Sequence, residues 1–227
     1  MSEKKQETKK AIILFSGGLD SSTCLYWALK KGYKCIALNV FYGQRHKKEI
    51  QSARAICKKL GVELLDIKLP LVWLEGATSL VGNKELPSQN LSKIKDGHIP
   101  STYVPARNLI FAALGVSLAE ARGAQAVILG ANAIDYSGYP DCRPQFYAPL
   151  NKAVLAGTKC GVEGKKIKIL TPLLHMTKAQ IVRLGLKLGV PFSMTWSCYK
   201  GGKKPCGVCD SCRLRAQGFW QARAEDK

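Results

Sequence analysis

The stretch AIILFSGGLDSST, residues 11–23, decides the fold. Its first five residues form a continuous apolar run, which is typical of a fully buried strand. Glycines follow at once, and a helix pattern then continues to about residue 31, where Gly32 ends it. Glycines let the backbone approach an anion, and a helix N-terminus directs unpaired N–H groups toward it. The stretch predicts a phosphate-binding strand–loop–helix unit, and the alternative is an ordinary tight turn between strand and helix.

The same alternation of short apolar runs and helix patterns continues along the chain. We expect strands at 35–41, 63–69, 126–129 and 167–170, and helices at 47–60, 108–122, 145–156 and from about 178 to Gly189. Thr177 and Gln180 form a capping-box pair at the start of the last of these helices. The alternation predicts an α/β fold with a doubly wound parallel sheet, Rossmann-like and three-layered. We divide the chain into a basic tail (1–10), an α/β domain (11–189) and a C-terminal segment (190–227) packed on it.

The absence of two common nucleotide-binding patterns restricts the kind of phosphate site. The chain has neither the Walker pattern G-x-x-x-x-G-K-[ST] nor the dinucleotide pattern G-x-G-x-x-G. The sequence S-G-G-x-D-S instead resembles the pyrophosphate-binding loop of the ATP pyrophosphatases, which cleave ATP between its α and β phosphates. That resemblance implies an ATP site formed by Leu14, Phe15, Ser16, Gly17, Gly18, Leu19, Asp20, Ser21, Ser22 and Thr23. Asp20 either binds Mg²⁺ or caps the helix.

Four of the nine cysteines are crowded near the C-terminus, as Cys198-x7-Cys206-x2-Cys209-x2-Cys212. Two Cys-x2-Cys steps can place sulfurs around a tetrahedral ion, and the longer spacer closes the shell. A closed four-sulfur shell leaves no coordination position open, so we expect one structural Zn²⁺ per chain. The alternatives are an iron–sulfur cluster and a reduced set without metal.

Composition restricts the class of protein. Lys and Arg number 35 against 16 Asp and Glu, a formal net charge of +19, which favours an anionic partner such as nucleotide phosphates or nucleic acid. The apolar runs are far shorter than the ~20 residues that cross a bilayer, so no membrane association is expected. The N-terminal residues lack the apolar stretch of a signal peptide, and nine cysteines is an odd count for a disulfide framework. We therefore expect a cytoplasmic protein with reduced thiols, and we interpret most of the charge as solvated surface.

Further strings extend the resemblance over residues 11–224. With the loop and the cysteines they resemble the 7-cyano-7-deazaguanine synthase family, and they are FYGQRH (41–46), VPARN (104–108), DYSGYPDCRP (135–144), TWSC (195–198) and PCGVCDSCRLR (205–215). Gln145, where family members often have an acid, and the basic tail depart from the pattern. The resemblance implies an adenine-nucleotide alpha-hydrolase-like fold, a homodimer, and ATP-dependent conversion of 7-carboxy-7-deazaguanine and ammonia to the nitrile. It implies an adenylated carboxylate, an amide intermediate and Mg²⁺ with the ATP, but no nucleic acid.

Residue roles follow from this chemistry as hypotheses. Carboxylates accept the donors of a deazaguanine edge, tyrosines stack on a base, and arginines meet a carboxylate or phosphate. We assign catalytic roles to Asp20, Ser22, Arg107, Asp135 and Asp141. We assign substrate binding to Gln44, Arg45, Asn108, Tyr136, Tyr139, Asp141 and Arg143. Simpler alternatives are that Asn108 caps a helix and that the tyrosines only pack a loop.

Two other functions compete with this one. A tRNA-modifying enzyme with the same loop, of the thiolation or lysidine type, would explain the positive charge. A basic zinc-ribbon protein that binds nucleic acid without catalysis would explain both the charge and the cysteines. Against the tRNA-modifying enzyme, no separate RNA-binding domain is recognisable in the sequence, and the base-recognition loop resembles that of a free-base enzyme.

Overall fold

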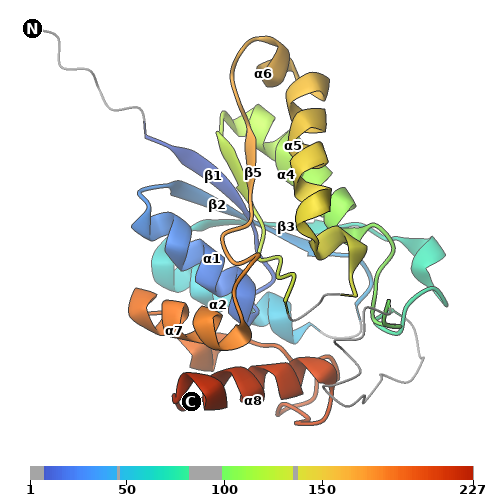
Figure 1. The fold of residues 1–227 in the computed structure, drawn as a ribbon, viewed down its shortest axis with the longest axis vertical. Coiled ribbons are helices and arrows are strands. Elements are labelled where there is room, and N and C mark those ends of the chain that lie inside the picture. Colours follow the sequence, from blue (N-terminus) through green and yellow to red (C-terminus); the bar gives the residue numbers. More distant parts are fainter. Residues whose placement is uncertain (1–7, 45–46, 82–98, 135–137, 227) are drawn as a thin grey trace, which may run out of the picture.

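A five-stranded parallel sheet organises the chain. The computed structural model describes residues 8–44, 47–81, 99–134 and 138–226. The strands are β1 (Lys10–Leu14), β2 (Lys34–Phe41), β3 (Glu63–Lys68), β4 (Ala126–Ile128) and β5 (Lys168–Leu170), in the spatial order β3-β2-β1-β4-β5 (Figure 1). All four strand pairs are parallel. The predicted doubly wound parallel sheet is confirmed.

Helices cover both faces of the sheet (Figure 1). On one face lie α1 (Leu19–Lys30), α2 (Lys48–Leu60) and α7 (Lys178–Leu188), and on the other lie α4 (Arg107–Arg122) and α5 (Pro144–Gly157). The remaining helices of the described residues are α6 (Lys159–Val162), α8 (Asp210–Ala222) and the 3-10 turns η1 (Val72–Leu74), η2 (Pro140–Cys142) and η3 (Phe192–Met194). Gly61 ends α2 in the left-handed conformation, and the capping box of Thr177 and Gln180 begins α7.

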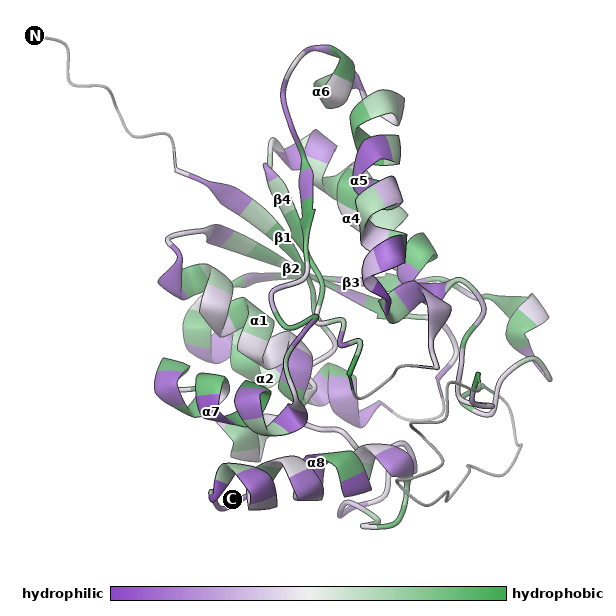
Figure 2. Ribbon diagram, in the orientation of Figure 1, coloured by the Kyte–Doolittle hydropathy of each residue, from purple (hydrophilic) through white to green (hydrophobic). Residues whose placement is uncertain are grey.

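The burial pattern of β1 explains why the chain folds as layers. Ala11 and Ile13 pack with α1, α2 and α7 on one face, whereas Ile12 packs with α4 and α5 on the other. A strand buried on both faces needs a continuous apolar run, and Figure 2 shows β1 and β4 as largely hydrophobic strands.

The C-terminal segment shares the core of the sheet domain. Val190, Phe192 and Phe219 are buried in the cluster that also contains α1 and α7, and the rings of Phe192 and Phe219 meet edge to face at 5.3 Å. The chain after residue 189 is therefore anchored by its own apolar side chains as well as by any metal. No helix among the described residues is long and apolar enough to cross a membrane.

The predicted helix at 108–122 is observed as α4, but the alternative that Asn108 caps it is wrong. Asn108 does not cap α4, because the N-cap is Ala106, which has a left-handed φ of 52°. The main-chain N–H of Asn108 instead donates to Asp141 Oδ2 at 3.0 Å. A carboxylate from a distant turn thus satisfies a donor in the first turn of the helix.

Candidate functional site

A cavity of about 250 Å³ opens at the carboxyl ends of the central strands. In the order β3-β2-β1-β4-β5, the strands before α4 are added on one side of β1 and the later strands on the other side, so the strand order reverses between β1 and β4. Ligands of open α/β sheets bind at such a switch point. The glycine loop after β1 and the segment Gly130–Asn132 after β4 both line this cavity.

The glycine loop is shaped by close packing against α2. Gly17 has a φ of +84°, and a Cβ there would lie 2.5 Å from both Glu49 O and Ala53 N. Any side chain at position 17 would displace the loop or the helix, so glycine is required on steric grounds. Gly130 is similarly confined, since its Cβ would lie 3.1 Å from Ser21 N at the start of α1. Two backbones therefore approach each other where a phosphate would meet the α1 N-terminus.

Polar groups of the loop form hydrogen bonds to one another at this position. Gly18 N–H donates to Ser16 Oγ at 3.2 Å, and Ser21 Oγ donates to Gly18 O at 3.2 Å. Among the buried side-chain nitrogen and oxygen atoms of the described residues, only Ser22 Oγ has no hydrogen-bond partner. A buried hydroxyl without a partner costs free energy, but Ser22 is not among the residues that line the cavity, so this cost identifies no ligand contact.

Asp20 is held by an ion pair that the sequence did not predict. Lys178 Nζ, at the start of α7, lies 2.8 Å from each oxygen of the Asp20 carboxylate. The two side chains are 8% and 21% exposed, so the pair is largely removed from water. The charge of Asp20 is thus compensated by Lys178, and its acceptor sites are shared with an ammonium group.

Arginine and tyrosine side chains also line the cavity. Arg107 donates to the hydroxyl of Tyr42 at 3.4 Å, and Tyr139 shares a hydrogen bond of 2.5 Å with Thr102. Glu49 also lines this cavity, and burial raises its carboxyl pKa to about 7, although nearby Arg107 lowers it. The cavity thus combines an anion-binding end with an arginine and a carboxyl group.

Apart from Asp141, Arg143 and the four cysteines, the predicted site residues divide into three groups. Cavity-lining residues are Leu14, Phe15, Ser16, Gly18, Asp20, Ser21, Gln44, Arg107, Asn108 and Tyr139. Gly17 shapes the loop from beneath, while Leu19, Ser22 and Thr23 are buried behind it. Arg45, Asp135 and Tyr136 lie outside the described residues, so their roles stay predictions.

Two residues predicted to bind substrate, Asp141 and Arg143, do not line the cavity. Asp141 is 6% exposed and is not among the residues that line the cavity, because its Oδ2 holds α4 through Asn108. Its main-chain oxygen accepts a hydrogen bond from the Tyr147 hydroxyl at 3.0 Å. Arg143 is exposed at the start of α5 and also does not line the cavity. The position of Asp141 favours a structural role, and the assignment of both residues to the substrate stays a prediction.

The C-terminal segment supplies the remaining wall. Trp196, Ser197 and Tyr199 line the cavity, and Trp196 N–H donates to Gly17 O at 3.1 Å. The Trp196 indole N–H donates to Cys198 O at 2.9 Å, while Lys48 Nζ lies 5.6 Å from the indole ring centre. The glycine loop is therefore joined through Trp196 to the cysteine cluster.

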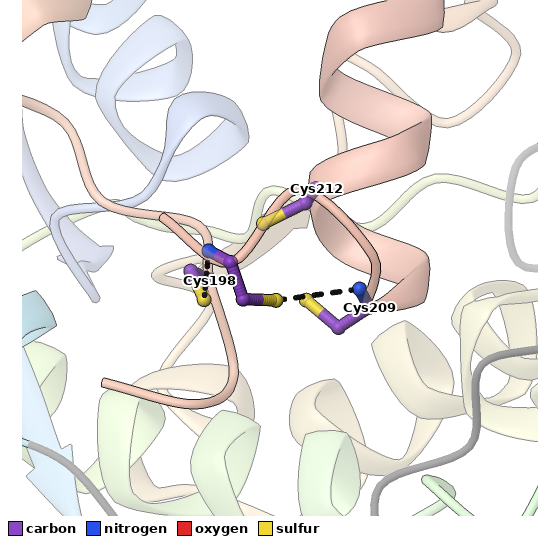
Figure 3. Close-up of side chains that lie close together, drawn as sticks. Cys198, Cys209 and Cys212 are labelled. Atoms are coloured by element: carbon purple, nitrogen blue, oxygen red, sulfur yellow. Dashed lines mark hydrogen bonds between the residues drawn. The ribbon is translucent and has the colours of Figure 1, made fainter. Parts of the chain in front are cut away.

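The four cysteines converge as their spacing predicted. Figure 3 shows Cys209 and Cys212 at the beginning of α8 with Cys198 on the facing loop, and the four Sγ atoms, Cys206 included, lie within 4.8 Å of one another. N–H groups of Cys206 and Cys209 donate to the sulfurs of Cys198 and Cys206. A tetrahedral zinc with bonds of about 2.3 Å separates its sulfurs by about 3.8 Å, so a small contraction completes the site.

Thiolate chemistry in the cluster also suits a metal. A hydrogen bond from the Cys212 thiol lowers the pKa of Cys209 to about 4, and the same bond raises the pKa of Cys212. A deprotonated sulfur is the form that binds a metal ion. The donor set fits zinc, and it fits an iron–sulfur cluster equally well.

Several residues of the site were not found from the sequence. The most important are Asn39, Glu49 and Trp196, which line the cavity, and Lys178, which pairs with Asp20. Asn39 carried a signal, since it is the one polar residue in the apolar run 35–41, and its side chain donates to Phe15 O at 2.8 Å. Lys178 and Glu49 lie in ordinary amphipathic helix patterns, so the sequence gave no signal for either residue.

Comparisons with known proteins agree with this geometry. A family model described as "Queuosine biosynthesis protein QueC" matches residues 10–223. A 7-cyano-7-deazaguanine synthase of Thermoplasma acidophilum is 49% identical over 220 residues, 97% of this chain and 91% of that protein. One of Acinetobacter baylyi is 48% identical over 219 residues, 96% and 93% of the two chains. The solved structure of NMN synthetase from Francisella tularensis is similar in fold, with a TM-score of 0.50, 18% identity and coverage of 95% and 84%.

Proposed function

Because the chain belongs to the QueC family of queuosine biosynthesis proteins, we propose that it is a C–N bond-forming ligase that makes a nitrile from a carboxylate. In this proposal 7-carboxy-7-deazaguanine and ammonia give 7-cyano-7-deazaguanine, while ATP is cleaved to AMP and pyrophosphate. The reaction proceeds through an adenylated carboxylate and then an amide. Curated relatives of nearly the same length have the synthase name, which supports the proposal.

The observation that best supports ATP use is the glycine loop between β1 and the N-terminus of α1, which lines the cavity. Gly17 lets the loop backbone pass close to α2, and the side chains of Ser16 and Ser21 belong to residues that line the cavity. A pyrophosphate group there would accept hydrogen bonds from these hydroxyls and from the N–H groups of the α1 N-terminus. The absence of a Walker lysine in the loop agrees with cleavage between the α and β phosphates.

The reaction needs positioning more than covalent catalysis. A carboxylate oxygen is a poor leaving group, so it attacks the α-phosphorus and pyrophosphate departs into the glycine loop. Ammonia then displaces AMP from the acyl carbon, and a second activation of the amide oxygen permits loss to the nitrile. Arg107 lines the same cavity as the loop, where its charge can stabilise the carboxylate or the α-phosphate.

Two metals belong to the proposal. Cys198, Cys206, Cys209 and Cys212 would hold one structural Zn²⁺, whose binding stabilises the wall formed by Trp196 and Tyr199. Asp20 fits Mg²⁺ less well than the sequence suggested, because Lys178 already binds both of its oxygens. Mg²⁺, when bound with ATP, would neutralise phosphate charge.

The test is a reaction of metal-replete protein with ATP, ammonium and 7-carboxy-7-deazaguanine. Appearance of AMP together with the nitrile is expected, and omission of any one substrate should abolish both. Failure to form nitrile would refute the synthase. The same preparation should run as a homodimer on size-exclusion chromatography, and fractionation of the source cells should recover it from the cytoplasm.

The alternatives are separated by RNA binding. The +19 charge is the observation that favours a tRNA-modifying enzyme. Tight, specific retention of tRNA near physiological salt would support that function, or a nucleic-acid-binding zinc ribbon. For the synthase we expect weak binding that disappears with added salt, because its substrate is a free base.

A further inference from the structure

Glu49 lies directly against the glycine loop. It belongs to the first turn of α2, and its main-chain oxygen would lie 2.5 Å from a Cβ on Gly17. Its side-chain Oε1 would lie 3.9 Å from a Cβ on Gly18. The carboxyl group therefore lies at the cavity, next to the loop that would receive pyrophosphate.

The charges around the cavity distinguish Glu49 from Asp20. These two residues are the carboxylates that line the cavity within the described part of the chain. Lys178 neutralises Asp20 through two contacts of 2.8 Å, whereas no ion pair or hydrogen bond within that part of the chain holds the Glu49 carboxylate. Glu49 is thus the acid that remains available to a cationic reactant.

The groups that face Glu49 come from several elements. Arg107 of α4 interacts with it electrostatically, Lys48 precedes it in the same helix turn, and Tyr42 and Asp20 share the cavity. Arg45 and His46 lie outside the described residues. Burial in this setting raises the pKa of Glu49 to about 7, partly offset by Arg107, and a general base works best when its pKa is near the working pH.

We propose that Glu49 is the catalytic base that takes a proton from ammonium so that ammonia can attack the adenylated carboxylate. The inference rests on the proposed function. Ammonium is the main form of this nitrogen at neutral pH, and it has no lone pair with which to attack. A carboxylate beside the acyl group both attracts the cation and accepts its proton.

The proton and electron balance of the step is complete. The Glu49 carboxylate accepts one proton from ammonium, which becomes ammonia. The nitrogen lone pair forms the C–N bond, the C–O bond to AMP breaks, and AMP leaves with that electron pair. The second proton is lost from nitrogen to water, Glu49 returns its own proton to water, and the amide remains.

The two half-reactions test this role with Glu49→Gln. Substrate-dependent exchange of labelled pyrophosphate into ATP measures adenylation, and amide formation from ammonium measures the second step. We expect amide formation to fall by about 10²-fold or more, the usual contribution of a general base, while exchange falls much less. In the wild type, at fixed total ammonium, the rate should show an inflection near pH 7 that the variant lacks.

Two control variants separate a proton-accepting role from a role in ATP binding. Glu75→Gln, at an exposed carboxylate after η1, should leave both half-reactions unchanged. Glu49→Asp keeps the acid and should restore part of the amide-forming rate. Equal loss of both half-reactions in Glu49→Gln would identify a role in ATP binding and overturn the inference, as would full retention of amide formation. Absence of exchange in the wild type would instead refute the proposed function itself.

Discussion

Replacing Lys178 by Met tests whether the buried ion pair stabilises the glycine loop. The ammonium contacts both Asp20 oxygens at 2.8 Å, and the Lys178 side chain is only 8% exposed. Its stem packs on α8, where a Cβ on Gly218 would lie 2.4 Å from Lys178 Cγ. Met retains most of this stem, so the substitution removes the charge with little change in packing.

The expected cost follows from the desolvation of Asp20. Breaking a buried pair by removing one partner typically costs about 3–5 kcal/mol, because the other charge is left unpaired. Asp20 keeps 21% of its side-chain surface, which places the value near the lower limit, at about 3 kcal/mol. For a chain of this size such a loss lowers Tm by roughly 6–12 °C.

The assay is chemical denaturation of the ligand-free protein in a double-mutant cycle. Asp20→Asn with Lys178→Met removes both charges, and we expect it to recover at least about 1.5 kcal/mol relative to the sum of the single variants. Lys187→Met, at an exposed lysine of the same helix, is the matched control and should change stability by less than about 0.5 kcal/mol. A loss below about 1 kcal/mol in Lys178→Met, or strictly additive variants, would refute the reasoning.

Three other outcomes are expected. Asp141→Ala should lower the free energy of unfolding by about 1 kcal/mol, because Asp141 Oδ2 holds the first turn of α4. A more than tenfold loss of substrate affinity with no change in stability would instead support the predicted role of Asp141 in substrate binding. Because the pKa of Glu49 is raised, the native state binds more protons than the unfolded state between about pH 4.5 and pH 7. The free energy of unfolding should therefore fall as pH rises through this window, by at most about 3 kcal/mol. Urea titrations of Glu49→Gln should lack this pH-dependent loss. Metal removal should expose residues 190–227 to protease and weaken ATP binding through Trp196. Cys160→Ser, at a partly buried cysteine outside the cluster, is the control, and metal analysis that finds iron would refute zinc.

The sequence alone was sufficient for the sheet and the cysteine cluster. Apolar runs such as residues 11–15 and 35–41 are buried on both faces, and their alternation with helices permits few topologies besides a doubly wound sheet. Cys206, Cys209 and Cys212 are close in the chain, so their spacing itself brings the sulfurs together. The end of α2 at Gly61 and the start of α7 at Thr177 and Gln180 could also be predicted, because each depends only on residues that are close in the chain.

The composition of the cavity was decided by the tertiary structure. Lys178 is 158 residues from Asp20, and only the packing of α7 beside α1 brings their charges together. Glu49 was indistinguishable from any surface glutamate until α2 was placed against Gly17, and Asp141 was assigned to a substrate before its contact with α4 was known. Local patterns encode backbone conformation because each residue's neighbours in the chain determine it, whereas the pKa, pairing and accessibility of a side chain depend on groups that only folding brings within a few ångströms.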